Sequence, residues 1–254
     1  VVPDFEEFSR RQGQNRLIPV SVEVIADLDT PLTLFSKIYQ DNEQVFLFES
    51  MEGGEKWGRY SFIGFNPLAV FESKGHDIWI KNTQTSANSV EKFSGDPLHY
   101  LRILVESMNA FEDPQLPRFC GGAVGYLGYD MVRFIEELPD SLEPHELPDS
   151  SFMIPGVVLV HDSFKQTVTI IRWVDTKDCV DLTILYQNSV DELNNLKQLL
   201  ESPVPSYFFE KSADHEKLGE ATFTSNMEPA QFRQMVEKAK AYILAGDIFQ
   251  VVLS

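Results

Sequence analysis

The chain has 254 residues, enough for one large domain or two smaller ones with a sizeable hydrophobic core. Its 43% hydrophobic and 24% charged residues are typical of an ordinary soluble globular protein. The 39 acidic and 21 basic residues give a net charge of −18, which argues against a general nucleic-acid binder because such proteins need a basic surface. The acidity is most simply a contribution to solubility.

Hydrophobic periodicity predicts an alternation of helices and strands along most of the chain. In chain order, these are a helix over 4–12, a strand over 17–25, a helix over 30–39, strands over 45–48, 59–63 and 78–81, a helix over 97–108, a hairpin of 152–161 and 167–174, a helix over 179–200, a strand over 221–224, a helix that ends before Gly246, and a strand over 247–254. The four consecutive apolar residues 45–48 predict a strand buried on both faces.

Capping residues and helix breakers define several boundaries. Thr30 can cap the helix whose first turn contains Pro31. Ser225 and Glu228 fit a capping box at the last helix, and Gly246 fits the position just past its end. Residues 138–151 are rich in Pro, Asp, Glu and Ser and predict a surface connection.

A polar segment with two prolines, 202–219, is the best linker candidate. We therefore expect an amino-terminal region over 1–201, a linker over 202–219, and the start of a second domain over 220–254. The sequence stops inside a predicted strand, so we expect a large C-terminal portion to be absent. The first residue is not Met, which is consistent with a trimmed start, and the acidic first residues show no signal-peptide pattern.

Cysteine content and hydropathy set further limits. Cys120 and Cys179 show no CxxC spacing, so we expect neither a structural disulfide nor a zinc site, and a reducing cytoplasm is the default location. No apolar run approaches the roughly 20 residues of a membrane-spanning helix. The five histidines are scattered, without a pair at helical spacing, so we expect no metal site from them.

The segment 118–130 is rich in glycine but does not fit a phosphate-binding loop. Gly121, Gly125 and Gly128 lack the GxGxxG spacing, and no GK[ST] follows. A strand in which backbones approach closely, with aromatic rings over the glycines, is the better interpretation. No GxSxG elbow is present, and no cysteine has a catalytic context. The residues by themselves predict no complete active site.

The polar pair Glu49-Ser50, which ends the apolar run 45–48, has two interpretations. A carboxylate can pair with an ammonium group, while a hydroxyl and strand-end amides can hold a carboxylate, so the pair suits a zwitterion. Phe46, Phe48 and Trp57 can supply an apolar wall for an aromatic ligand. The alternative is that Glu49 begins a turn and Ser50 caps it, and the local sequence favours this alternative.

Four segments, in this order, resemble component I of anthranilate synthase, one of the chorismate-utilising enzyme families. The segments are Phe46–Ser50, Gly58–Gly64 (GRYSFIG), Gly121–Asp130 followed by Arg133 and Ile135-Glu136, and Gly246–Ser254 (GDIFQVVLS). The resemblance implies an α/β (α+β) fold with two packed, roughly orthogonal, mainly antiparallel sheets and flanking helices. It also implies a truncated chain, with a regulatory region followed by only the start of the chorismate-binding catalytic domain.

The family makes anthranilate and pyruvate from chorismate and ammonia with Mg²⁺, in tryptophan biosynthesis. A separate glutaminase subunit, component II, supplies the ammonia from glutamine. The resemblance therefore implies a cytoplasmic lyase with that partner. It places the Mg²⁺ ligands and most chorismate contacts beyond residue 254, so the fragment alone is expected to be inactive.

The resemblance also implies roles for individual residues. Glu49 and Ser50, bordered by Lys56, fall on the family's feedback site for L-tryptophan, which reverses the preference for a simple turn. Gln250 falls where isochorismate- and salicylate-forming relatives carry a lysine that activates water. Glutamine cannot act as that base, so Gln250 points to an amine nucleophile near the substrate ring. A structural glutamine that faces inward from its strand is the alternative.

Two other functions remain open from the sequence. The first is aminodeoxychorismate synthase component I, a related enzyme of the folate branch. Val252 favours anthranilate synthase over this enzyme, because the folate branch more often has Asn at that position. A non-catalytic module that senses a ligand is the alternative if the chain truly ends at residue 254.

Overall fold

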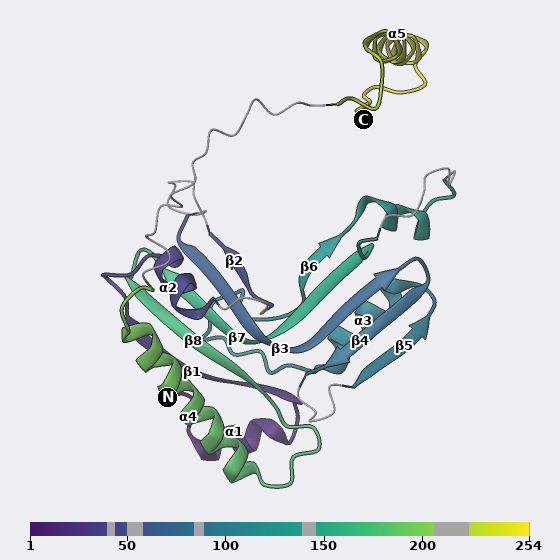
Figure 1. Ribbon diagram of the computed structural model, residues 1–254. Helices are drawn as coiled ribbons and strands as arrows, with labels where there is room; N and C mark the ends of the chain where they lie inside the picture. Colours follow the sequence, from purple (N-terminus) through teal and green to yellow (C-terminus); the bar gives the residue numbers. More distant parts are fainter. Residues whose placement is uncertain (40–43, 50–57, 84–88, 139–145, 206–223, 254) are drawn as a thin grey trace. The chain divides into compact units, whose positions relative to one another are not determined.

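The computed structural model describes residues 1–39, 44–49, 58–83, 89–138, 146–205 and 224–253 (Figure 1). The chain divides into two compact units, Val1–Phe208 and Phe209–Ser254. Most of the predicted linker over 202–219 and nearly all of the predicted strand over 221–224 lie outside the described residues. The boundaries of the three regions 1–201, 202–219 and 220–254 stay a prediction.

The first unit is an antiparallel sheet with helices on its faces (Figure 1). Its helices are α1 (Phe5–Gln12), α2 (Pro31–Ile38), α3 (Pro97–Ser107), α4 (Leu182–Glu201) and the 3-10 helix η1 (Tyr129–Phe134). Its strands are β1 (Leu17–Ile25), β2 (Phe46–Phe48), β3 (Tyr60–Lys74), β4 (Asp77–Asn82), β5 (Val90–Ser94), β6 (Val124–Leu127), β7 (Ser150–Asp162) and β8 (Thr167–Asp175). The predicted α/β class with mainly antiparallel strands and flanking helices is confirmed. The two packed, roughly orthogonal sheets that the resemblance implied are, among the described strands, one continuous sheet.

Two long strands, β3 and β7, pair with each other from Tyr60↔Asp162 to Ser73↔Ser150. At one end they are flanked by β2 on one side and by β8 and β1 on the other. At the other end they are flanked by β4 and β5 on one side and by β6 on the other. Each end is therefore a five-stranded arm, and both arms belong to one continuous sheet (Figure 1).

The sheet bends where the two arms meet. The β3–β7 register shifts between Pro67 and Ala69, and Pro67 lies opposite Pro155. Proline has no N–H to donate to a ladder, so strand prolines are found at bulges and edges. Asn66 has φ +47°, and a Cβ on Gly156 would lie 2.4 Å from the Asn66 carbonyl oxygen. The bend therefore depends on prolines and on a glycine at a close backbone contact.

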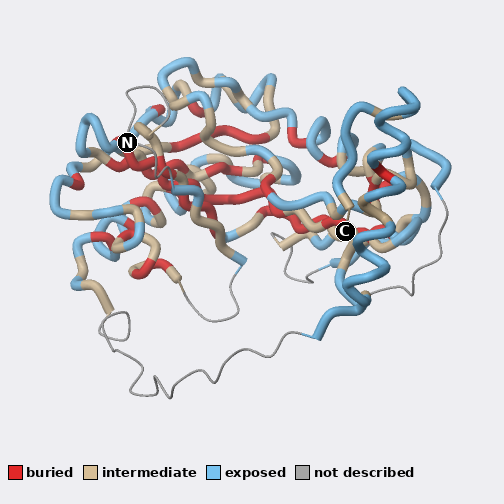
Figure 2. Tube along the Cα trace, turned by 90° about the horizontal axis from the view of Figure 1, so that it is seen from above, coloured by how far each residue is buried: buried red, intermediate tan, exposed pale blue. Residues whose placement is uncertain are grey.

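Two hydrophobic cores lie on opposite faces of the sheet. One is covered by α1, α2 and α4 and contains Phe8, Ile18, Ile63, Phe65, Val157, Leu159, Ile170 and Leu193. The other is covered by α3 and the segment after it and contains Leu68, Phe71, Ile78, Leu104, Ile154, Val158, Ile171 and Trp173. The buried stretches in Figure 2 run along the central strands, so the long strands β3 and β7 contribute to both cores.

Helix caps match the sequence closely in the first unit. Asp4, Asp96 and Asp181 cap α1, α3 and α4 by accepting backbone N–H bonds, and Thr30 forms a reciprocal capping box with Thr33. Each such cap satisfies helix N–H groups that have no partner within the helix, a contribution of about 1 kcal/mol.

Three strand predictions are corrected by the structure. The strand at 45–48 is not buried on both faces, because β2 pairs only with β3 among the described strands and Phe48 is 50% exposed. The edge strand β5 was not predicted, since its mostly exposed residues show no hydrophobic alternation. The surface connection over 138–151 ends early, because Ser150 begins β7 and its buried hydroxyl bonds that of Ser73 at 2.6 Å.

The second unit contains α5 (Pro229–Ala245), and the left-handed Gly246 (φ +82°) ends it as predicted. Glu228, not Ser225, is the N-cap, because Glu228 and Gln231 exchange the two capping hydrogen bonds. The strand predicted over 247–254 is absent from residues 247–253. A strand needs a hydrogen-bonded neighbour, and residues 224–253 contain no other strand to pair with it.

None of the helices in the described part of the chain is both long enough and apolar enough to cross a bilayer.

His161 is a buried titratable group on β7, opposite Ser61 of β3. It is 5% exposed, and its Nε2 atom has no hydrogen-bond partner within the described part of the chain. Burial lowers the pKa of the ring below its ordinary value of 6.5, although the Asp29 backbone and the carboxylates of Asp162 and Asp29 act in the opposite direction. The folded protein therefore holds His161 in its neutral form.

We expect Gly125→Val to lower the free energy of unfolding by about 3 kcal/mol or more. A Cβ at Gly125 would lie 1.9 Å from the Ser151 carbonyl oxygen and 2.6 Å from the Phe152 Cα, and neither backbone atom can move aside cheaply. Urea unfolding followed by circular dichroism measures the change. Gly13→Ala is the control, because its nearest neighbour is at an ordinary 3.6 Å, and a change within about 0.5 kcal/mol is expected. Equal stability of the two variants would contradict the close approach.

We expect the protein to lose stability as the pH falls below about 6.5, and His161→Phe to reduce that loss. The lowered pKa means that the unfolded chain binds a proton that the folded chain does not, so the contribution is present above 6.5 and declines toward the folded pKa. Unfolding midpoints in urea between about pH 7.5 and pH 5.5 measure the slope. His99→Gln replaces an exposed histidine and should retain the wild-type slope. The same slope in both variants would exclude His161 as its source.

Candidate functional site

The predicted tryptophan site begins at the end of β2, where Glu49 follows Phe48. Glu49 is exposed, and its carboxylate has no ion pair or hydrogen bond with any residue that the structure describes. Ser50 and Lys56, the other two predicted binding residues, lie outside the described residues. The structure therefore places one of the three residues, and it leaves that carboxylate available to a ligand.

Two aromatic side chains precede Glu49 on β2. The rings of Phe46 and Phe48 lie 4.9 Å apart between centroids. Phe46 packs over Gly64 of β3, where a Cβ would lie 2.1 Å from its ring. Two of the three aromatic residues predicted to form the apolar wall are thus adjacent, while Trp57 lies outside the described residues. Phe48 and Glu49 are consecutive residues, and both are exposed.

Arg59, the residue before β3, forms an ion pair with Asp162, the last residue of β7. Arg59 Nε lies 2.9 and 3.0 Å from the two carboxylate oxygens of Asp162, and Nη2 lies 2.6 Å from Oδ2. The guanidinium also lies over the rings of Tyr60 (4.9 Å) and Phe164 (5.5 Å). This bidentate pair joins the start of β3 to the end of β7.

Asp162 is also bound by the hairpin turn that follows it. Its Oδ1 accepts the backbone N–H groups of Phe164 at 3.0 Å and Lys165 at 3.1 Å. Burial acts to raise the pKa of this carboxyl group, but the hydrogen bonds from Arg59, Lys165 and Phe164 outweigh it, and the pKa lies below its ordinary value. Asp162 is therefore a carboxylate whose charge is already neutralised by protein groups.

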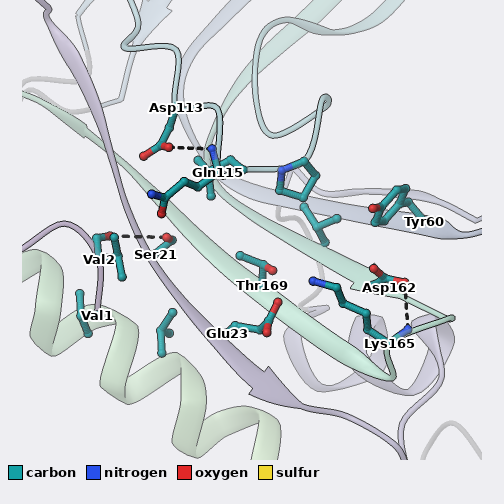
Figure 3. A pocket seen from close by; sticks show the side chains of 14 residues that line it. Val1, Val2, Ser21, Glu23, Tyr60, Asp113, Gln115, Asp162, Lys165 and Thr169 are labelled. Atoms are coloured by element: carbon teal, nitrogen blue, oxygen red, sulfur yellow. Dashed lines mark hydrogen bonds between the residues drawn. The ribbon is translucent and has the colours of Figure 1, made fainter.

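A pocket of about 420 Å³ opens on the sheet face that carries Asp162 (Figure 3). Its walls come from β1, β3, β7, β8, the β7–β8 turn and the segments 1–2 and 113–117. Figure 3 shows Glu23 and Thr169 on neighbouring strands, with the amino group of Lys165 directed back over β8. Its volume falls within the usual range for small-molecule sites.

The sequence did not predict this pocket. Glu23 and Lys165 carry its available charges, yet they are distant in sequence and belong to no motif. The only signal was a charged residue within the alternating strand 17–25, which faces solvent in most proteins. The β1–β8 register, which places Glu23 opposite Thr169, is the information that was missing.

The glycine-rich segment has the structural role that the sequence predicted. A Cβ on Gly121 would lie 2.6 Å from the Trp173 indole nitrogen, and one on Gly128 would lie 2.8 Å from the Asp149 carbonyl oxygen. The Trp173 indole N–H also donates to the Cys120 carbonyl at 2.7 Å. These close contacts explain the glycines without a phosphate ligand.

Gln250 lies in the second unit, in the irregular segment after α5, and is exposed. Its side chain makes no hydrogen bond within the described part of the chain. The structure brings no other predicted site residue to it, so its placement near a substrate stays a prediction.

The Mg²⁺ ligands are predicted to lie beyond residue 254, and this stays a prediction. No group of three or more His, Cys, Asp or Glu side chains among the described residues could hold a metal ion. Asp162 and Asp113 do face one pocket, but each is already paired with an arginine. The donor set therefore does not fit a resident Mg²⁺ ion.

Curated proteins with similar sequences carry one name, anthranilate synthase component 1. Anthranilate synthase component 1 of Acetivibrio thermocellus is 37% identical over 99% of this chain and 50% of that protein. The protein of the same name from Synechocystis sp. is 36% identical over 100% of this chain and 51% of its own length. The chain thus spans about half the length of these curated relatives.

One solved structure extends the comparison to the fold. Anthranilate synthase component I from Streptococcus pneumoniae TIGR4 matches with a TM-score of 0.56 and 21% identity, over 88% of this chain and 46% of that chain. The family model for chorismate binding enzymes matches residues 43–254, most of the chain. The chain belongs to the family of chorismate binding enzymes.

Proposed function

We propose that this chain is the amino-terminal half of the large subunit of anthranilate synthase. The reaction would convert chorismate and ammonia to anthranilate and pyruvate. The observation that carries this proposal is the similarity to proteins named anthranilate synthase component 1, at 36–37% identity along nearly the whole chain. The match spans both units, including the segment 246–254 that resembles the opening of the catalytic region.

The main role proposed for the first unit is regulatory. Glu49, Ser50 and Lys56 would bind L-tryptophan, with the ammonium group on the Glu49 carboxylate and the indole against Phe46 and Phe48. Two observations support this assignment: Glu49 is exposed and has no partner among the described residues, and the rings of Phe46 and Phe48 are adjacent on the same strand. Tryptophan would inhibit by binding one conformation better than the one that turns over chorismate.

The partners of the reaction are proposals as well. A glutaminase subunit would supply ammonia from glutamine, and the words "component 1" in the names of the relatives support a second component. Gln250 would lie near the substrate ring and leave the nucleophile to be an amine, because an amide cannot act as a base toward water. Mg²⁺ would be held by residues other than those described.

The activity is tested in a full-length protein that contains this sequence. We expect incubation with chorismate, ammonia and Mg²⁺ to produce anthranilate, which is followed by its fluorescence. Appearance of 4-amino-4-deoxychorismate would instead assign the protein to the folate branch. Absence of any chorismate turnover would favour a module that only senses a ligand.

We expect Ser50→Arg in that protein to weaken tryptophan inhibition by roughly ten- to a hundredfold and to leave the uninhibited rate unchanged. The new side chain would remove the hydroxyl that holds the ligand carboxylate and would fill the mouth of the site. Initial rates at increasing tryptophan concentration give the inhibition constant. Ser9→Arg adds the same charge at an exposed position of α1 and should leave inhibition intact. Retained inhibition in Ser50→Arg would refute the assignment.

A further inference from the structure

The pocket of Figure 3 contains two opposite charges that the protein leaves without partners. Four charged side chains line it, but Asp113 pairs with Arg11 at 2.9 Å and Asp162 pairs with Arg59 at 2.6 Å. The remaining two are Glu23 and Lys165, and neither side chain makes an ion pair or hydrogen bond within the described part of the chain. Among the described side chains, the pocket therefore offers a ligand one carboxylate and one ammonium group without a partner.

The strand register fixes where these charges stand. Glu23 of β1 lies opposite Thr169 of β8, and Asp162 of β7 lies opposite Thr167, with Lys165 in the turn between β7 and β8. Glu23 and Lys165 both line the pocket without forming a salt bridge, so their charged atoms are more than 4.0 Å apart. The Thr169 side chain, which makes no hydrogen bond within the described residues, lines the pocket beside Glu23. The two charges are therefore not paired with each other.

Apolar surface also lines the pocket. It comes from Tyr60, Leu116, Pro117 and Val160, and Val160 is 1% exposed. A ligand with charged groups and an apolar side chain would thus find complementary surface for both. A simple cation would leave Lys165 unpaired and a simple anion would leave Glu23 unpaired, whereas a zwitterion satisfies both.

We propose that this pocket binds a free α-amino acid with an apolar side chain. The ammonium group contacts Glu23, the carboxylate contacts Lys165 and the Thr169 hydroxyl, and the side chain lies against Tyr60 and Leu116. This site is separate from the one proposed at Glu49, and the inference does not depend on the function proposed above. It adds a second amino-acid site to the first unit of the chain.

The chain labelled with ¹⁵N is titrated with L-phenylalanine to millimolar concentration and followed by NMR. We expect saturable shifts of the amide signals of Glu23, Lys165 and Thr169. N-acetyl-L-phenylalanine lacks the ammonium group and L-phenylalanine methyl ester lacks the carboxylate, so each should bind about fivefold more weakly or worse. No shift at these residues, or equal binding of the three compounds, would overturn the proposal.

Variants provide the second measurement. Glu23→Gln and Lys165→Met should each weaken L-phenylalanine binding about fivefold or more, because each removes one exposed charged contact. Glu91→Gln and Lys92→Met make the same changes on the exposed edge strand β5 and should leave binding unchanged. Glu49→Gln should also leave it unchanged. Loss of binding in Glu49→Gln alone would overturn the proposal and place the amino-acid site at Glu49, at the end of β2. That result would leave the proposed anthranilate synthase activity, which is tested by anthranilate formation, unaffected.

Discussion

The pairing of β3 with β7 is the interaction on which the rest of the first unit depends. These strands are distant in sequence, so the chain must close a long loop before their ladder can form. Once formed, the ladder presents Ile63 and Leu159 to one core and Leu68 and Val158 to the other. Both hydrophobic cores therefore need the same pair of strands, and neither can be completed by local contacts alone.

The bend in that pair decides where the sites lie. Because β3 and β7 change register at Pro67, one arm gains β2, β8 and β1 while the other gains β4, β5 and β6. Glu49, where a tryptophan site is proposed, and the pocket of Figure 3, where an amino-acid site is proposed, both belong to the arm that contains β2, β8 and β1. The ion pair between Arg59 and Asp162 lies in the same arm, at the end of β7, so both regions lie near the same end of the β3–β7 ladder.

The sequence predicted elements whose signals are local. The strand β1, the β7–β8 hairpin and the Thr30 cap follow from alternation, turn residues and capping chemistry. The burial of β2 and the strand after Gly246 could not be predicted, because each depends on whether a neighbouring strand is present. The same limit applies to sites: Glu49 was assigned from the family resemblance of one short segment and stays a prediction, whereas the Glu23 pocket exists only through strand register.

One carboxylate, that of Asp162, connects the residue before β3 with the pocket of Figure 3. Asp162 holds Arg59, which precedes β3, and its side chain also lines the pocket that contains Lys165. The Asp162 carboxylate accepts the Lys165 backbone N–H as well, so movement of the Lys165 turn and movement of the first residues of β3 both act on the same group. Coupling between two ligands requires such a shared element with a different energy in each bound state. Asp162 is the residue through which the Lys165 turn and the residue before β3 are connected.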